Sequence, residues 1–135
     1  MSEGGGGFLM EPARFPGRAP IEAYGNGGFR FADMSHRGSI LALPSGIEAW
    51  PVASAAEIAP ASLERVIAEA PAIEILLVGT GETMVPLSRE TRVALEAVGL
   101  VPELMATGAA VRTFNVLLSE NRAVAAALVA VQGIR

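Results

Sequence analysis

The first half of the chain has short apolar runs separated by turn-forming residues, which predicts β-strands. Apolar runs at 21–24 and 29–31 flank a Gly-Asn-Gly-Gly segment, and an Asn-Gly pair between two such runs indicates a hairpin. A third strand is expected at 39–43, and an extended run follows at 47–52. Pro51 cannot donate a ladder hydrogen bond, so this run is expected to lie at a strand end or a sheet edge.

The next part of the chain alternates between helix-like and strand-like patterns. Apolar residues on one helical face predict a helix over 62–70, which Pro71 ends. The run 73–78 is almost continuously apolar, which is typical of a strand covered on both faces. Ser88 is a favourable N-cap residue, so a helix is expected from there to about residue 98.

The last third predicts a short strand, a helix and a final apolar segment. The short strand is expected at 102–105, and Thr107 is expected to cap the helix that follows. The segment 122–131 could be a helix or a buried strand. A strand is favoured, because Asn121 provides a break and the segment has no polar face. This order of elements predicts an α/β domain with a mixed sheet and helices on its faces.

The N-terminal residues have a different composition from the rest of the chain. Residues 1–18 are rich in glycine and show neither a strand period nor a helix period, so we expect a flexible tail followed by a single domain over 19–135. A length of 135 residues fits one domain. No export signal is recognisable. The longest apolar run, 123–131, is too short for a membrane span, which needs about 20 residues. A cytoplasmic location is therefore expected.

Composition excludes several kinds of chemistry. The chain has no cysteine and no lysine, which excludes thiol nucleophiles, disulfides, cysteine-based zinc sites, Schiff bases and Walker-type phosphate loops. It has one histidine, so a histidine-rich metal cluster is excluded, and we expect no metal or cofactor. The net charge of −4 argues against nucleic acid as a partner.

Four short motifs occur in an order that resembles a known family. They are Leu-Leu-Val-Gly-Thr-Gly at 76–81, Pro-Leu at 86–87, Thr-Gly-Ala-Ala-Val-Arg-Thr-Phe-Asn-Val-Leu at 107–117 and Glu-Asn-Arg-Ala-Val-Ala-Ala-Ala-Leu at 120–128. The chain resembles a family of small domains of unknown function, whose eukaryotic members include a mitochondrial assembly factor for respiratory complex I. The resemblance covers about 21–131.

This resemblance implies a three-layer α/β fold on a mixed five-stranded sheet, with a small N-terminal hairpin, and no established enzymatic activity for most members. Phe114 stands where the family usually has tyrosine, and Asn121 stands where it usually has glycine. The missing tyrosine hydroxyl argues against chemistry on that helix. The function favoured is therefore a non-catalytic protein-interaction module, in which the partner is another protein or a second copy of the chain.

A ligand site is the alternative function. Gly79, Thr80 and Gly81 follow the most apolar strand, and ligands in open α/β sheets bind at the carboxyl ends of strands. Arg112 and Asn115 lie on one stripe of the next helix and could complete a small-molecule or anion site, which leaves an enzyme open. The structural interpretation is that the glycines only allow a sharp turn, that the arginine pairs with an acid and that the asparagine satisfies backbone groups.

Asp33, Ser35 and His36 do not make a catalytic triad. They lie within four residues, whereas the members of a triad converge from separate elements. Asp and Ser favour turns, so a solvated loop with local hydrogen bonds is expected there.

An interaction surface is expected at the predicted sheet edge. The chain is 51% hydrophobic and only 18% charged, which predicts an exposed apolar patch. Ile47, Trp50 and Val52 are residues of the kind found in interface cores, so we expect them to contact a protein partner or another copy.

Overall fold

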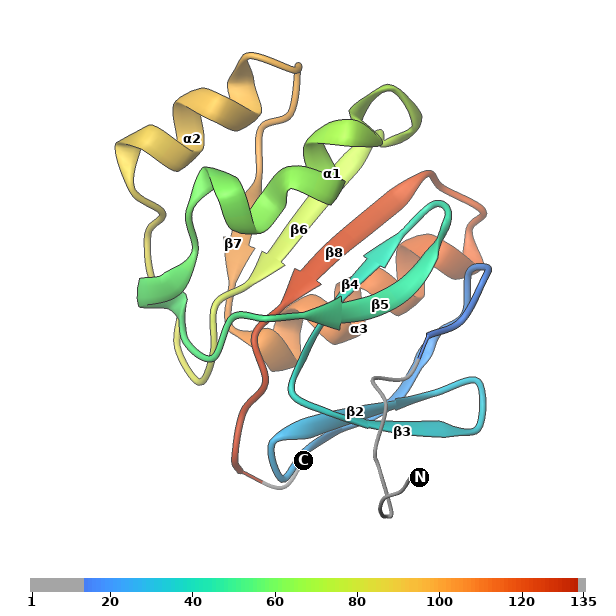
Figure 1. Cartoon of the computed structure of the whole chain (residues 1–135). Helices are drawn as coiled ribbons and strands as arrows, with labels where there is room; N and C mark the ends of the chain where they lie inside the picture. Colours follow the sequence, from blue (N-terminus) through green and yellow to red (C-terminus); the bar gives the residue numbers. More distant parts are fainter. Residues whose placement is uncertain (1–13, 134–135) are drawn as a thin grey trace, which may run out of the picture.

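A mixed five-stranded sheet forms the centre of the computed structural model, which describes residues 14–133 (Figure 1). Its strand order is β5-β4-β8-β6-β7. Strand β8 is parallel to β6 and antiparallel to β4, while β7 is parallel to β6 and β5 is antiparallel to β4. The strands are β4 (Ser39–Leu43), β5 (Gly46–Trp50), β6 (Ile75–Gly79), β7 (Glu103–Met105) and β8 (Val124–Leu128).

The final segment is the strand that the sequence favoured. All five residues of β8 are buried, since the strand lies between β4 and β6 and is covered on both faces. Asn121 provides the break before it, with a φ of 60° in the left-handed region that asparagine tolerates better than most residues. Pro51 follows the edge strand β5 directly, as expected.

A second, three-stranded antiparallel sheet is formed by β1 (Ile21–Gly25), β2 (Gly28–Phe31) and β3 (Met34–Arg37). The predicted hairpin is confirmed as β1 and β2. The prediction of a solvated loop around residues 33–36 is wrong, because residues 34–37 pair with β2 along their whole length. Within β3, half-buried and buried Met34 and His36 alternate with exposed Ser35 and Arg37, which is the pattern of a strand covered on one face.

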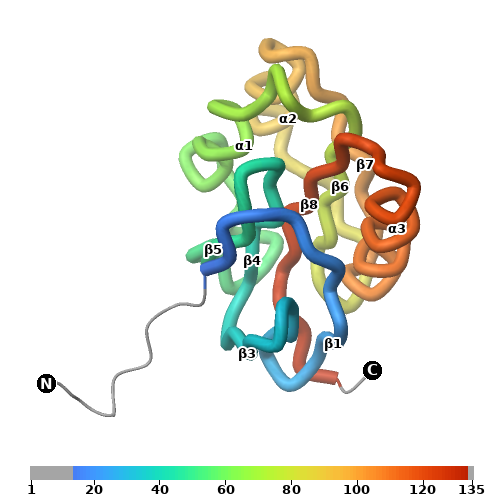
Figure 2. The backbone as a smooth tube through the Cα atoms, turned by 90° about the vertical axis from the view of Figure 1, so that its right-hand side faces the viewer, coloured from blue at the N-terminus to red at the C-terminus, as the bar shows by residue number. Residues whose placement is uncertain are grey.

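Helices cover both faces of the central sheet (Figures 1 and 2). Helices α1 (Glu64–Ala68) and α2 (Arg89–Glu96) pack on one face, while α3 (Thr107–Ser119) packs on the other together with the small sheet. The helix predicted over 62–70 is shorter than expected, because proline-containing 3₁₀ turns flank α1 at Pro60–Leu63 and Ala70–Ala72. Ser88 caps α2 as predicted and accepts a hydrogen bond from the Thr91 amide at 3.1 Å.

Each face of the sheet has its own apolar core. One core joins α1 and α2 to the sheet, and the other joins α3 and the small sheet to it. Alternate residues of β8 pack into the two cores. Ala125 and Ala127 belong to the core under α1 and α2, and Val124, Ala126 and Leu128 belong to the core under α3 and the small sheet. This arrangement is the three-layer α/β fold that the sequence predicts.

The start of the described chain lies against the domain. The Phe15 amide donates to the Ile47 carbonyl at 3.0 Å, and the Ile47 amide donates to the Phe15 carbonyl at 2.9 Å. The Arg18 guanidinium donates to the carbonyl of Arg122. Within residues 14–18 of the predicted tail, the bonds of Phe15 and Arg18 join the chain to β5 and to the loop before β8. Residues 1–13 of the predicted tail lie outside the described residues.

Candidate functional site

The loop after β6, where the sequence predicted a ligand site, is held by its own hydrogen bonds. The Thr80 side chain is buried. Its hydroxyl donates to the Thr83 carbonyl at 2.8 Å and accepts from the Val85 amide at 2.9 Å. Both bonds lie within the loop, so this hydroxyl fixes the loop's shape.

Thr107 connects the same loop to the end of β8. Its hydroxyl accepts from the Gly81 amide at 3.0 Å and donates to the Val129 carbonyl at 2.7 Å, while its own amide donates to the Gly81 carbonyl at 2.8 Å. The N-cap of α3 is Ala106, so the expectation that Thr107 caps this helix is wrong. The hydroxyl instead joins the loops that leave β6 and β8, because the first turn of α3 starts directly beside them.

The two glycines of the loop have different structural requirements. A Cβ on Gly79 would lie 2.9 Å from the Cα of Thr107 and 3.1 Å from the Cβ of Ala110, so this glycine allows α3 to approach β6 closely. Gly81 has open space around it but a φ of +121°, which L side chains rarely adopt. These requirements agree with the structural interpretation of the glycines.

The polar stripe on α3 does not lie at that loop's pocket. Asn115 accepts from the Ile21 amide and donates to the Ile21 carbonyl, both at 2.9 Å, so it fastens β1 to the helix. Arg112 is exposed and makes no ion pair among the described residues. Neither residue lines the pocket that Thr80 and Gly81 line. The five residues predicted as one ligand site are thus divided between two places.

That pocket has a volume of about 520 Å³ and lies at the carboxyl ends of β6 and β8. Its walls are residues 53–56, 80–82 and 129–132 together with Val85. Alanine and valine predominate among them. The carboxylate of Glu82 accepts a hydrogen bond from the Gly133 amide at 3.2 Å. This lining suits an apolar group better than an anion.

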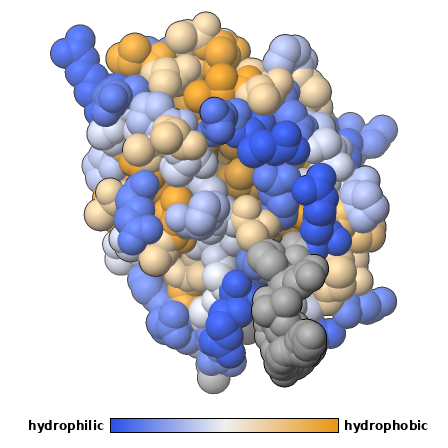
Figure 3. Space-filling model, in the orientation of Figure 1, coloured by the Kyte–Doolittle hydropathy of each residue, from blue (hydrophilic) through white to orange (hydrophobic). Residues whose placement is uncertain are grey.

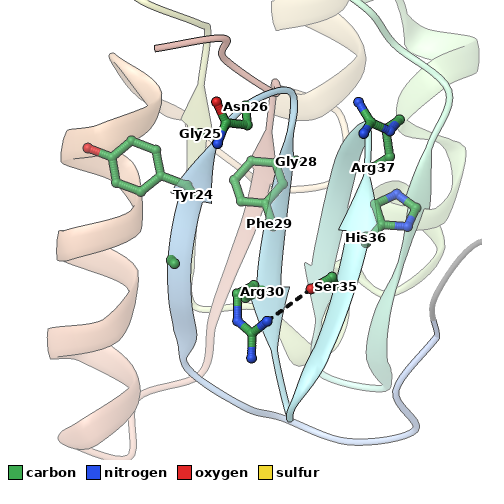
Figure 4. A pocket seen from close by; sticks show the side chains of 10 residues that line it. Tyr24, Gly25, Asn26, Gly28, Phe29, Arg30, Ser35, His36 and Arg37 are labelled. Carbon is green, nitrogen blue, oxygen red and sulfur yellow. Dashed lines mark hydrogen bonds between the residues drawn. The ribbon is translucent and has the colours of Figure 1, made fainter. Parts of the chain in front are cut away.

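A second pocket, of about 470 Å³, lies over the small sheet (Figure 4). Arg30, Ser35, His36 and Arg37 are among its lining residues. His36 is 7% exposed, and its burial lowers its pKa, an effect partly opposed by a hydrogen bond with the Ser39 backbone. The two arginines were not singled out from the sequence. The alternation of residues 34–37 was the one signal that could have placed Arg37 on a sheet face.

The predicted interface at the β5 edge is wrong. Ile47, Trp50 and Val52 are 1%, 2% and 3% exposed, since they pack inside the domain. The Trp50 indole Nε1 donates to the Ser62 carbonyl at 2.7 Å, which joins β5 to the turn before α1. These side chains therefore cannot anchor a partner while the domain is folded.

The exposed apolar side chains lie elsewhere. Large ones in the described part of the chain are Met84, Val85, Val93, Val98, Val101 and Val116. Five of these six fall between residues 84 and 101, in α2 and the loops on either side of it. Figure 3 shows an apolar area at the top of the molecule, over the region that α2 and its following loop occupy in Figure 1.

Within residues 14–133, no three or more His, Asp or Glu side chains are grouped so that they could hold a metal ion. In the same residues, no helix is both long and apolar enough to cross a membrane.

Comparison with known proteins gives matches over most of the chain. Residues 21–129 match the model of a family described as protein of unknown function (DUF498/DUF598). A crystal structure of an outer membrane protein from Bartonella henselae is similar, with 56% identity, a TM-score of 0.84 and coverage of 87% of this chain and 99% of that one. An uncharacterised protein of Rhodobacter capsulatus is 38% identical over 88% of this chain and 90% of its own length.

Curated relatives with a named role are also matched. NADH dehydrogenase [ubiquinone] 1 alpha subcomplex assembly factor 3 of Xenopus tropicalis is 36% identical over 109 residues, which are 81% of this chain and 60% of that protein. The present chain therefore spans about three fifths of the length of that assembly factor.

Proposed function

The chain belongs to the DUF498/DUF598 family of proteins of unknown function, and from this membership and the assembly factors similar to it we propose that it is a non-catalytic protein-interaction module that assists assembly of a respiratory NADH dehydrogenase complex. The observation that carries the proposal is the similarity to assembly factor 3, which extends over 81% of this chain. The family match over residues 21–129 includes both sheets and the helices.

The internal bonds of the domain support this function over catalysis at the β6 loop. The hydroxyls of Thr80 and Thr107 bond to backbone groups of their own domain, and the side chain of Asn115 bonds to Ile21. Side chains with these tasks stabilise the fold and are not free to act on a substrate. The structural use of these groups argues against catalysis at this loop, and the similarity to assembly factors supports the assembly role.

The apolar surface on α2 supports protein binding. Val93 is 52% exposed and Val101 is 76% exposed, and large exposed apolar groups near one another are typical of interaction sites. They lie on the face opposite α3, where Val116 is 56% exposed on its own helix. We therefore place partner binding on the α2 side.

Gene replacement tests this proposal. Cells that lack the gene are expected to accumulate incomplete NADH dehydrogenase complexes in native gels and to lose NADH:quinone activity in their membranes. The wild-type gene should restore both, and Val93→Asp with Val101→Asp should not. Val116→Asp is the control for the change at Val93, since it places one negative charge at a helical valine of similar exposure, 56% against 52%, on the other face. Normal complexes in cells without the gene would contradict the proposal.

The pocket of about 520 Å³ favours a second candidate function, which is binding of a small molecule with an apolar part. Its volume falls within the usual range for ligand pockets, about 300–1,000 Å³. Ala55 lines this pocket and its replacement by Trp should fill it. A metabolite that raises the melting temperature of the wild-type protein, and not of Ala55→Trp, would support this candidate. The absence of such a compound from a broad metabolite set would argue against it.

A further inference from the structure

The outer face of the small sheet carries positive charge that the described residues do not neutralise. Arg30 on β2 and Arg37 on β3 are both exposed. Arg30 donates to the Ser35 hydroxyl at 3.1 Å, and neither arginine takes part in an ion pair within residues 14–133. The arginines that do form such pairs are Arg14, Arg65 and Arg122.

The strand register places the two arginines on one face. Arg30 lies opposite Ser35 and Arg37 lies opposite Gly28, so the arginines are diagonal neighbours. Cα atoms at diagonal positions of an antiparallel pair are about 7–8 Å apart. No acidic side chain is among the residues that line the pocket with these two arginines, so an anionic ligand there meets positive charge that the lining does not neutralise.

Small residues make the floor of the pocket between and beside these arginines. Ala23, Gly25 and Gly28 line it together with Arg30 and Arg37. Gly28 lies opposite Arg37, and a Cβ there would collide with the His36 carbonyl of the neighbouring strand, so this position requires glycine. The pocket has a volume of about 470 Å³, and Tyr24, Asn26, Phe29 and His36 also line it.

Figure 4 shows the two guanidinium groups directed toward opposite ends of this pocket, with Ser35 between them. A single small anion would reach one guanidinium at a time. An extended ligand with two separated anionic groups would reach both. The geometry therefore favours a chain over a lone ion.

We propose that this face binds an extended acidic segment of a protein partner, with one carboxylate on Arg30 and another on Arg37. Alternate residues of an extended chain are about 6.6 Å apart and point to the same side, so two acidic side chains at such positions can extend toward the two ends of the pocket, where the guanidinium groups lie. Arginine accepts carboxylates bidentately. The volume of the pocket, about 470 Å³, leaves room for the peptide main chain. This binding does not depend on which complex the protein helps to assemble.

Titration of the full-length protein with a synthetic peptide tests the proposal. The probe has a Glu-Ala-Glu core, the control peptide has Gln-Ala-Gln, and binding is followed by amide shifts in ¹⁵N NMR spectra. The acidic peptide should shift the amides of Gly25, Gly28 and Ser35, and the control peptide should not. Exposed charge pairs contribute little each, so Arg30→Gln and Arg37→Gln should each weaken binding about fivefold, and both together about 25-fold.

Arg92→Gln is the matched control, because Arg92 is an exposed arginine on α2, which covers the other face of the central sheet. It should bind the peptide as the wild type does. Equal weakening in this variant would overturn the proposal, since attraction would then follow overall charge. Inorganic phosphate that produces the same shifts at the same concentration would also overturn it, in favour of a small-anion site. A variant that lacks residues 1–13 gives a further test. If its Gly25, Gly28 and Ser35 amides differ from those of the wild type with no peptide added, acids of the chain's own N-terminal segment occupy this face. That result would overturn the proposal.

Discussion

The loop after β6 and the outer face of the small sheet use polar groups in opposite ways. At the loop, the hydroxyls of Thr80 and Thr107 are buried and bond to backbone groups of the same domain. On the small sheet, Arg30 and Arg37 are exposed and pair with no acid among residues 14–133. The first region is built for stability, and the second keeps its charges available.

This contrast shows why a glycine-rich segment after a buried strand is weak support for a ligand site. A glycine at the end of a strand is also needed wherever a helix packs closely against that end, as α3 does at Gly79. Charged groups that the fold leaves unpaired give a better indication of binding. Substitutions in the two regions should therefore affect different properties.

Thr107→Val should have the largest effect on stability. Valine has a similar shape but leaves the Gly81 amide and the Val129 carbonyl without their buried partner, which should lower the free energy of unfolding by about 2–4 kcal/mol. Urea denaturation measures this change. Thr113→Val on the same helix is the control and should cost far less, because no side-chain bond of Thr113 is lost. If both variants lost the same free energy of unfolding, the hydroxyl of Thr107 would have no special part in stabilising the loop after β6.

Asn115→Leu should be the next in size. It removes both bonds to Ile21 and should lower the free energy of unfolding by about 1–3 kcal/mol. The loss should be local, so hydrogen exchange at the Ile21 amide should accelerate more than exchange in β6. Uniform acceleration in both places would show that β1 is not separately fastened by this side chain.

His36 should make a smaller, pH-dependent contribution. Burial lowers its pKa in the folded state below the ordinary value of 6.5, so the unfolded chain binds the proton more readily. The free energy of unfolding should therefore fall as the pH drops from about 6.5 through the lower, folded-state pKa. His36→Gln should flatten this part of the stability curve. Urea denaturation at several pH values measures how steeply the free energy of unfolding depends on pH. An unchanged slope in His36→Gln would contradict the prediction.

Arg30→Gln and Arg37→Gln should have the smallest effect on stability. Both side chains are exposed and form no ion pair within residues 14–133, so the free energy of unfolding should change by no more than about 0.5 kcal/mol. Removing two neighbouring like charges could even raise it. A loss similar to that of Asn115→Leu would mean that the arginines are structural, and the contrast between the two regions would fail.

Local signals made much of the fold predictable. The Asn-Gly turn, the continuous apolar run of β6 and the cap at Ser88 each specify structure within a few residues. Strand β3 was missed because it is short and its exposed residues resemble those of a turn. Helix α1 was overestimated because the apolar period continues into the proline-containing turns on both sides.

The roles of side chains were less predictable, because they depend on distant parts of the chain. Asn115 bonds to a residue 94 positions away, and no local pattern reveals such a pairing. Trp50 has the composition of an interface anchor, but the turn before α1 covers it. A sequence shows that an apolar residue must be covered, and it does not show whether its own domain or a partner covers it.

The central place of β8 has a consequence for how the protein is made. Among the strands of the described residues, β8 is the last to leave the ribosome, yet it lies between β4 and β6, which leave the ribosome much earlier. Until residues 124–128 emerge, the nascent chain holds two strands with unpaired edges and no strand to join them, a state prone to aggregation. The central sheet therefore cannot close until residues 124–128 have left the ribosome, and a chain that stops before β8 cannot form it.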